Sequence, residues 1–138
     1  MKAALKKTIP TPLWRAAGET YDAIRRLPEV PRAYFHPWRR ESIRKLAALK
    51  DIHRGERCFI IGNGPSLRQT DVSRLKNEYT FGLNRIYMAF EDWGFSTTYF
   101  VSINDLVIEQ TAADIQNLKM PKFITWRARH WLQMDENM

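Results

Sequence analysis

The fold is decided by the stretch Cys58-Phe59-Ile60-Ile61-Gly62-Asn63-Gly64-Pro65-Ser66. Its first four residues form a continuous apolar run, which is typical of a parallel strand covered on both faces. The five that follow are small or polar residues of the kind that form turns. In an open α/β sheet such a turn lies at the carboxyl end of a strand, where ligands bind. The stretch therefore predicts the first strand and the binding turn of an α/β domain.

Three more short apolar runs follow, and they predict the strands Tyr79–Leu83, Tyr99–Ile103 and Lys122–Trp126. Between the last two strands, apolar residues recur at helical spacing over 105–118, which predicts a crossover helix with Ile108, Ala112 and Ile115 on one face. Strands that alternate with helices indicate a parallel sheet with right-handed connections. We expect an α/β fold with a partial Rossmann-like parallel sheet of about four strands. Because complete nucleotide-binding folds of this type have more strands, residues 56–138 are interpreted as a domain incomplete at its C-terminus, from a longer protein or a shortened relative.

Residues 1–55 are predicted to form a basic helical appendage with a proline-rich connector. A first helix has Leu13, Ala17, Tyr21 and Ile24 on one face and ends near Pro28. The prolines at 28, 31 and 37 predict an extended connector over 28–38. A second helix is expected over 39–52, with Gly55 closing it.

The positive charge of the chain is concentrated in its first part. Residues 1–57 contain 14 Lys and Arg against 6 Asp and Glu, whereas residues 58–138 contain 8 against 9. Mixed with Trp14, Tyr34, Phe35 and Trp38, this charge could contact anionic lipid, nucleic acid or a partner protein, or it could be a solvated helical surface. No nucleic-acid-binding motif accompanies it, so nucleic acid is not an expected partner.

The chain has no signal-peptide pattern and no run of the roughly 20 apolar residues of a membrane span. A cytoplasmic location is the default expectation, with peripheral contact to the inner membrane through the basic helices as an extension of it. The lone Cys58 permits no intramolecular disulfide, and its place in an apolar run predicts a buried, inert thiol. The sequence does not indicate an oligomeric state.

The turn after the first predicted strand has the composition of a phosphate- or ribose-binding loop. Gly62 and Gly64 let the backbone approach a ligand closely, and Asn63 can donate and accept hydrogen bonds. Pro65 rigidifies the turn, and Ser66 is placed to cap a helical turn or to bind a phosphate. The dinucleotide fingerprint and the P-loop lysine are absent, and a tight turn without a ligand remains the alternative.

Two further polar pairs stand at the ends of the next strands. Asn84 and Arg85 follow the second strand, and Asn104 and Asp105 follow the third. Asparagines at three successive strand ends would meet at one edge of a parallel sheet, which suits ribose hydroxyls and base edges, although each alone is more often a turn or cap residue. Arg85 could pair with phosphate or lie in a surface salt bridge, and Asp105 could bind Mg²⁺, orient a hydroxyl or cap the helix. The histidines lack ligand spacing, so no metal site is predicted.

The run Gly-Asn-Gly-Pro-Ser-Leu at 62–67, with Asn84, Arg85 and Asn104 downstream, resembles the nucleotide-binding half of the Campylobacter-type bacterial sialyltransferases. It is equally similar to the 6-hydroxymethylpterin diphosphokinase-like family, and the resemblance covers roughly residues 56–126. By the first likeness, Asn63, Gly64, Ser66, Asn84 and Asn104 would bind a CMP-sugar donor. The resemblance thus implies a transferase, with no tightly bound cofactor, that acts on a glycan acceptor in bacterial surface glycan or lipopolysaccharide synthesis.

The second likeness implies pyrophosphate transfer from ATP with Mg²⁺. Members of that family have a cluster of acids after the third strand, whereas this chain has Asp105 alone, and that departure favours the sugar-nucleotide donor. The segment that contains the catalytic residues of the sialyltransferases has no counterpart in this chain, so no catalytic residue is assigned. A non-catalytic nucleotide-binding or interaction module is the third hypothesis.

Overall fold

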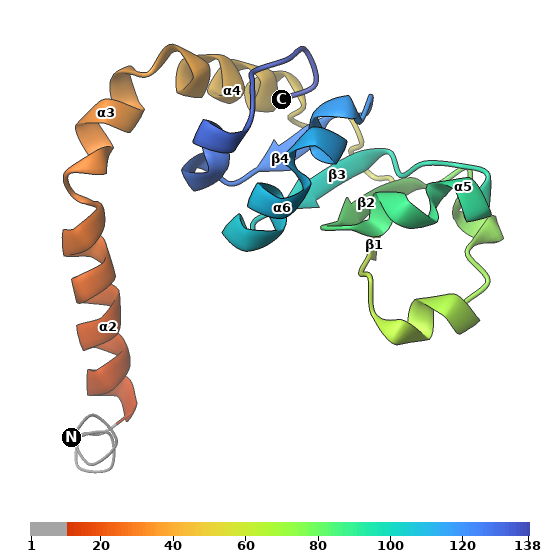
Figure 1. Cartoon of the computed structure of the whole chain (residues 1–138), viewed down its shortest axis with the longest axis horizontal. Helices are drawn as coiled ribbons and strands as arrows, with labels where there is room; N and C mark the ends of the chain where they lie inside the picture. Colours follow the sequence, from red (N-terminus) through yellow and green to blue (C-terminus); the bar gives the residue numbers. More distant parts are fainter. Residues whose placement is uncertain (1–10) are drawn as a thin grey trace. The chain divides into compact units, whose positions relative to one another are not determined.

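The computed structural model describes residues 11–138, which divide between two compact units, Met1–Ala48 and Leu49–Met138. We call them the N-terminal unit and the sheet unit, and each is described by itself. The N-terminal unit contains the helices α2 (Thr11–Arg26), α3 (Glu29–Phe35) and α4 (Pro37–Ala48) (Figure 1). The start of the chain, with three of its lysines, lies outside the described residues.

The first predicted helix is confirmed by α2, but the predicted extended connector over 28–38 is wrong. That segment contains α3 and the beginning of α4. The prolines do not interrupt either helix, because Pro28 is the N-cap of α3, Pro31 lies in its first turn and Pro37 is the first residue of α4. Backbone N–H groups at these positions have no partner inside a helix, so a residue without an N–H group is tolerated there.

The helix α4 ends at Ala48, four residues before the predicted end at Ile52. Turns occupy the following residues, and two of them have a left-handed backbone, Asp51 at φ 60° and Gly55 at φ 84°. Aspartate and glycine are among the residues that adopt this conformation most readily. The turns bring the chain to the first strand of the sheet.

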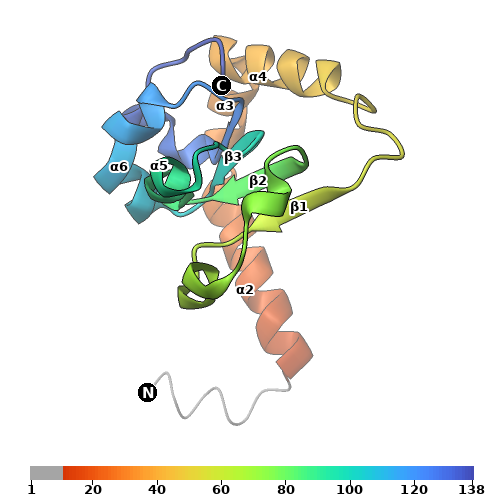
Figure 2. The same ribbon diagram turned by 90° about the vertical axis from the view of Figure 1, so that its right-hand side faces the viewer.

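The sheet unit is built on four parallel strands in the order β1-β2-β3-β4; β1, β2 and β3 are labelled in Figure 2 and all four in Figure 1. Their bounds are Cys58–Ile61, Tyr79–Leu83, Tyr99–Ser102 and Lys122–Ile124. All four strands were predicted, although β3 and β4 end one and two residues earlier than expected. The short helices η1 (Pro65–Gln69) and η2 (Ser73–Leu75) connect β1 to β2, η3 (Ile86–Ala89) and α5 (Phe90–Trp93) connect β2 to β3, and α6 (Asp105–Asn117) connects β3 to β4. The architecture is a partial Rossmann-like α/β fold.

The core of the sheet unit lies between one face of the sheet and its connecting helices. Phe100 of β3, Ile108 and Ile115 of α6, and Ile86 of η3 are fully or almost fully buried. The backbone of Gly82 makes the closest approach, because a Cβ atom there would lie 2.5 Å from Ile86 Cγ2. Only a residue without a side chain fits this position of β2.

The first strand is an edge strand, and this corrects the expectation for Cys58. Ile61 faces the core and is 5% exposed, whereas Ile60 is 73% exposed and Cys58 is also exposed. Successive residues of a strand point to opposite faces, so Cys58 and Ile60 lie on the same face of β1. The predicted burial of the thiol is wrong because this strand is covered on one face only.

The other face of the sheet is aromatic. The ring of Phe81 lies 4.8 Å from that of Tyr99 and 6.0 Å from that of Phe123, measured between centroids. The ring of His53, in the turn before β1, lies 3.7 Å from that of Tyr79 between centroids and is tilted by 42°, and its Nε2 shares a 2.5 Å hydrogen bond with the Tyr99 hydroxyl. Burial raises the pKa of Tyr99 above its ordinary value. This cluster attaches the turn to the amino ends of β2 and β3.

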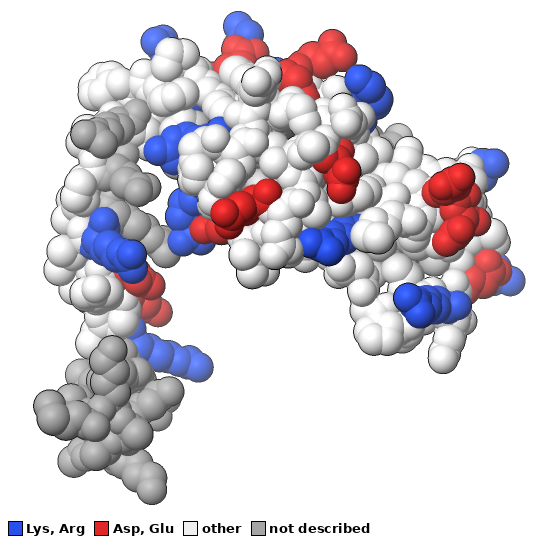
Figure 3. All heavy atoms as spheres, viewed as in Figure 1, with Lys and Arg blue, Asp and Glu red and all other residues white. Residues whose placement is uncertain are grey.

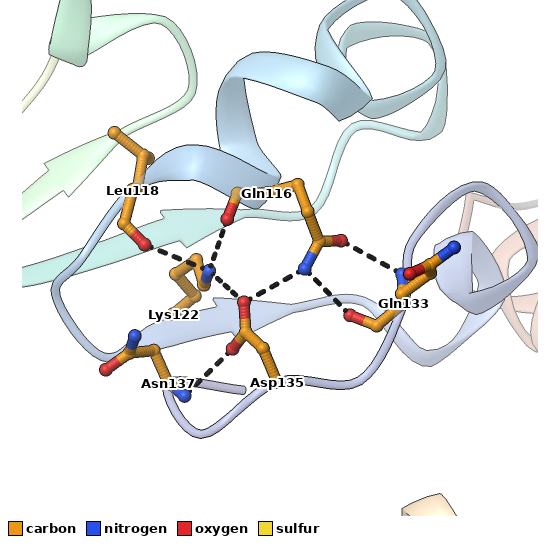
Figure 4. A network of polar contacts seen from close by, with 6 residues as sticks. All are labelled: Gln116, Leu118, Lys122, Gln133, Asp135 and Asn137. Atoms are coloured by element: carbon orange, nitrogen blue, oxygen red, sulfur yellow. Dashed lines mark hydrogen bonds and ion pairs between the residues drawn. The ribbon is translucent and has the colours of Figure 1, made fainter.

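A buried charge attaches the C-terminal segment to the sheet (Figure 4). The Lys122 side chain is 0% exposed, and its Nζ donates to Asp135 Oδ2 at 2.6 Å and to the carbonyl oxygens of Gln116 and Leu118. The Gln116 amide donates to Asp135 Oδ2 and to the Gln133 carbonyl oxygen, each at 3.0 Å. The network therefore joins β4, the end of α6 and residues 133–137 in one polar cluster.

Replacing Gly82 with alanine is expected to lower the free energy of unfolding by about 1–3 kcal/mol, because the new methyl group would displace Ile86 and Thr97. Urea denaturation followed by circular dichroism measures the change. Gly62→Ala is the matched control, because nothing lies within 4 Å of a Cβ atom at that position. Equal stability of the two variants would contradict the packing described for β2.

Lys122→Met is expected to lower the free energy of unfolding by about 3 kcal/mol, because it leaves Asp135 without the cation that it contacts in a largely buried place. The exposed pair Arg57–Glu78 is the control, since the Arg57 side chain is 75% exposed and Arg57→Gln should change stability far less than Lys122→Met. A small effect of Lys122→Met would mean that the network does not hold the C-terminal segment.

Candidate functional site

The parallel register brings the predicted site residues to one edge of the sheet. Ile61 pairs with Gly82, Leu83 with Val101, and Ser102 with Ile124. The segments that begin at Gly62, Asn84, Ile103 and Thr125 therefore leave the sheet side by side at the carboxyl ends of its strands. This edge is where open α/β sheets bind ligands.

The turn after β1 runs into the short helix η1. Gly64 is its N-cap, with an extended backbone at φ −73° and ψ 161°, and Pro65 is its first residue. Ser66 is the second residue and makes no capping hydrogen bond, so the predicted capping role is wrong. Among the described residues no hydrogen bond is formed by the side chain of Asn63 or by the Ser66 hydroxyl, and both groups are left available to a ligand.

Neither the backbone conformation nor the packing of this turn requires glycine at positions 62 and 64. Neither Gly62 nor Gly64 has a positive φ angle. A Cβ atom at Gly62 would meet nothing within 4 Å, and one at Gly64 would meet only Ser66 Oγ at 3.9 Å. The fold of the described chain would accept alanine at both positions, in contrast to Gly82.

Asn84 links the ends of β2 and β3. Its backbone is left-handed at φ 54°, its N–H donates to the Val101 carbonyl oxygen at 2.9 Å, and its Oδ1 accepts from Ser102 Oγ at 3.1 Å. Arg85 is exposed and donates to Gln110 Oε1 of α6 at 2.7 Å. Among the described residues its guanidinium forms no salt bridge with a carboxylate, so that alternative is wrong, and a contact with a phosphate stays a prediction.

Asn104, rather than Asp105, caps the helix α6. Its Oδ1 accepts from the N–H groups of Leu106 and Val107, at 3.1 Å and 3.3 Å. The predicted capping role of Asp105 is therefore wrong, because the preceding residue already occupies the cap position. Asp105 Oδ2 instead lies 3.7 Å from Nε of Arg127, and its Oδ1 is buried without a hydrogen bond from the described residues.

Two residues of this edge were missed by the sequence reasoning. Ser102 is 1% exposed and holds the Asn84 amide from inside β3. Arg127 was missed because β4 was predicted to extend to Trp126, whereas it ends at Ile124 and leaves Arg127 in the short helix η4 (Trp126–Trp131). The short run of polar and basic residues after the apolar part of this strand was the available signal.

Several side-chain hydrogen-bond donors lie after the carboxyl ends of the strands. The Nδ2 groups of Asn84 and Asn104 form no hydrogen bond with the described residues, and the guanidinium groups of Arg85 and Arg127 come from the segments that follow β2 and β4. Asp105 is the one carboxylate among the first three residues that follow each described strand. In the described part of the chain, no group of three or more His, Cys, Asp or Glu side chains could hold a metal ion. The donors suit an anionic or hydroxyl-rich ligand.

No family model, no curated protein and no solved structure matches this chain.

Asn104→Ala is expected to lower the free energy of unfolding by about 1 kcal/mol, because the first N–H groups of α6 lose their acceptor. Asn104→Asp keeps an acceptor oxygen at the same place and should leave stability unchanged. Urea denaturation of the two variants separates the contribution of the capping oxygen to stability from that of the amide group. Equal losses in both variants would contradict the assignment of Asn104 as the cap.

Proposed function

We propose that the sheet unit is a nucleotide- or nucleotide-sugar-binding domain of transferase type, most consistent with a sialyltransferase-like glycosyltransferase of surface glycan synthesis. The observation that carries the proposal is the pair Gly62 and Gly64. Neither backbone geometry nor packing requires glycine there, yet both stand at the carboxyl end of β1. A ligand that approaches this backbone closely accounts for the absence of side chains.

The polar groups around the glycines fit the parts of a nucleotide. Asn63 and Ser66 lie in the same turn as the glycines, and their side chains make no hydrogen bond with the described residues. Asn84 and Asn104 each use the amide oxygen within the fold and keep the amide nitrogen for a ligand. Such amide donors bind ribose oxygens and the acceptor atoms of a base.

A sugar-nucleotide donor is favoured over a magnesium complex of ATP. A Mg²⁺ site is usually built from one or two carboxylates with phosphate oxygens, and Asp105 is the single candidate. Its Oδ2 atom already faces Arg127 at 3.7 Å, and that cation opposes a second one. Arg127 is instead suited to the negative charge of a donor phosphate, with Asp105 holding the guanidinium in place.

The mechanistic demand of such a transfer is stabilisation of the departing nucleotide phosphate. Preformed donors that face the phosphate would lower the free energy of the transition state more than that of the ground state. In this chain Arg127 and the backbone N–H groups of the glycine turn are the groups of that type at the sheet edge. No residue is assigned as a general base.

Calorimetric titration of the purified chain with cytidine monophosphate, and with ATP with and without Mg²⁺, tests the proposal. Saturable binding of the cytidine nucleotide in the absence of metal is the expected result. Magnesium-dependent binding of ATP alone would favour the diphosphokinase-like alternative. Nucleotide binding without turnover of a CMP-sugar would identify a non-catalytic module, and binding of neither nucleotide would refute a nucleotide site in this chain.

Asn63→Ala is expected to weaken nucleotide binding by more than about 1 kcal/mol while leaving the fold intact, because one hydrogen bond is lost. Gly62→Ala should also weaken binding without loss of stability, since its methyl group meets only the ligand. Gly18→Ala, at an equally open position of α2, is the control and should bind normally. Unchanged affinity of both site variants would remove the glycine turn from the site.

A further inference from the structure

The whole net charge of the chain belongs to the N-terminal unit. Residues 1–48 contain 11 Lys and Arg against 4 Asp and Glu, a net charge of +7, which equals the net charge of the full chain. Residues 49–138 are therefore neutral as a whole. A positive charge confined to one unit favours an anionic partner for that unit.

The helix α2 separates apolar from charged residues around its circumference. At about 100° per residue, Ala17, Tyr21 and Ile24 fall within one half, and Arg15 and Arg25 fall within the other. Glu19 and Asp22 also lie on the charged half. Figure 3 shows charged side chains of both signs on the described part of α2, next to uncharged surface.

The apolar half of α2 is exposed and continues beyond the helix. Tyr21 is 65% exposed and Ile24 is 60% exposed. Leu27 continues the helical hydrogen bonding, donating from its N–H to the Ala23 carbonyl oxygen at 3.1 Å, and it is exposed as well. No described side chain of residues 15–48 is buried.

Aromatic and basic residues also adjoin one another in α3 and α4. Phe35 is 77% exposed and packs edge-on against Tyr34 at 5.5 Å. The guanidinium of Arg39 lies 5.5 Å from the centre of the Tyr34 ring. Exposed aromatic rings next to cations are characteristic of residues at the boundary between lipid headgroups and acyl chains.

We propose that the N-terminal unit binds the surface of an anionic lipid bilayer, with the apolar half of α2 inserted at the headgroup boundary. The surface needs a partner that is both negatively charged and apolar. A nucleic acid offers the charge without the apolar surface, and a second copy of the chain would bring +7 against +7. An anionic bilayer offers both.

The binding is peripheral. Within the described residues, no helix has the length and the apolar character that crossing a bilayer requires. An amphipathic helix with arginines on its polar side lies in the plane of the membrane instead. The inference is independent of nucleotide binding, because it rests on α2, α3 and α4 alone.

Co-sedimentation of the full chain with vesicles tests the proposal. With vesicles of phosphatidylcholine containing about 30% phosphatidylglycerol, we expect the chain to pellet at low salt and to be largely released at about 0.5 M NaCl. Vesicles of phosphatidylcholine alone should bind at least about tenfold less. Absence of binding to the anionic vesicles at low salt would overturn the proposal.

Two pairs of substitutions separate the charge from the apolar face. Arg15→Gln with Arg25→Gln should weaken binding by about fivefold for each arginine. Arg74→Gln in the sheet unit is the matched control and should bind normally. Tyr21→Ser with Ile24→Ser should weaken binding by at least about tenfold, whereas Met88→Ser, which changes an equally exposed apolar residue of the sheet unit, should not.

Circular dichroism of each variant shows whether the helices remain, so that loss of structure is not mistaken for loss of binding. Vesicle binding that survives both double substitutions in folded protein would overturn the proposal. The proposal would also be overturned if analytical ultracentrifugation showed that the chain is a dimer and that the Tyr21 and Ile24 substitutions convert it to a monomer. A nucleic-acid surface would be indicated by two results together. The Arg15 and Arg25 double variant would bind vesicles as well as Arg74→Gln does, and it alone would lose binding to RNA.

Discussion

The last part of the sheet unit depends on one buried cation. Lys122 has no exposed side-chain surface, and its ammonium group must therefore find its partners inside the protein. It finds them in two carbonyl oxygens at the end of α6 and in Asp135, which brings three separate segments together. Because α6 and β4 are fixed relative to one another in this way, Asp105 at the beginning of α6 and Arg127 just after β4 also come to lie within 3.7 Å.

The glycines of the chain show how one residue type serves opposite purposes. Gly82 is required because the interior of the sheet unit leaves no room for a methyl group, whereas a methyl group at Gly62 would meet nothing within 4 Å and one at Gly64 would meet only Ser66 Oγ at 3.9 Å. The side-chain amides of Asn84 and Asn104 also divide their roles. The oxygen of Asn84 stabilises a strand end and that of Asn104 caps a helix, whereas their nitrogen atoms form no hydrogen bond with the described residues. A binding site built from such residues costs the fold little, because the atoms that hold the backbone are not those that would face a ligand.

The sequence predicted the strands well and the environment of their residues poorly. Continuous apolar runs between turns identified all four strands, because burial of a sheet against helices leaves that pattern. The prolines misled, since their effect depends on whether they fall in the interior or in the first turn of a helix. Cys58 was misjudged because an apolar run does not reveal which strand lies at an edge. Lys122 and Arg127 could not be assigned, since their roles follow from contacts with distant segments and from a strand end shifted by two residues.

The order of the strands also bears on how the sheet unit folds. Each strand pairs with the next one along the chain, across the short connections 62–78, 84–98 and 103–121. Closing loops of this length loses less entropy than pairing strands that are distant in the sequence, which favours faster pairing. During synthesis from the N-terminus, each new strand would therefore emerge after the strand with which it pairs. The sheet can grow in the order of synthesis, and the ion pair between Lys122 and Asp135 can form only when the C-terminal segment has been made.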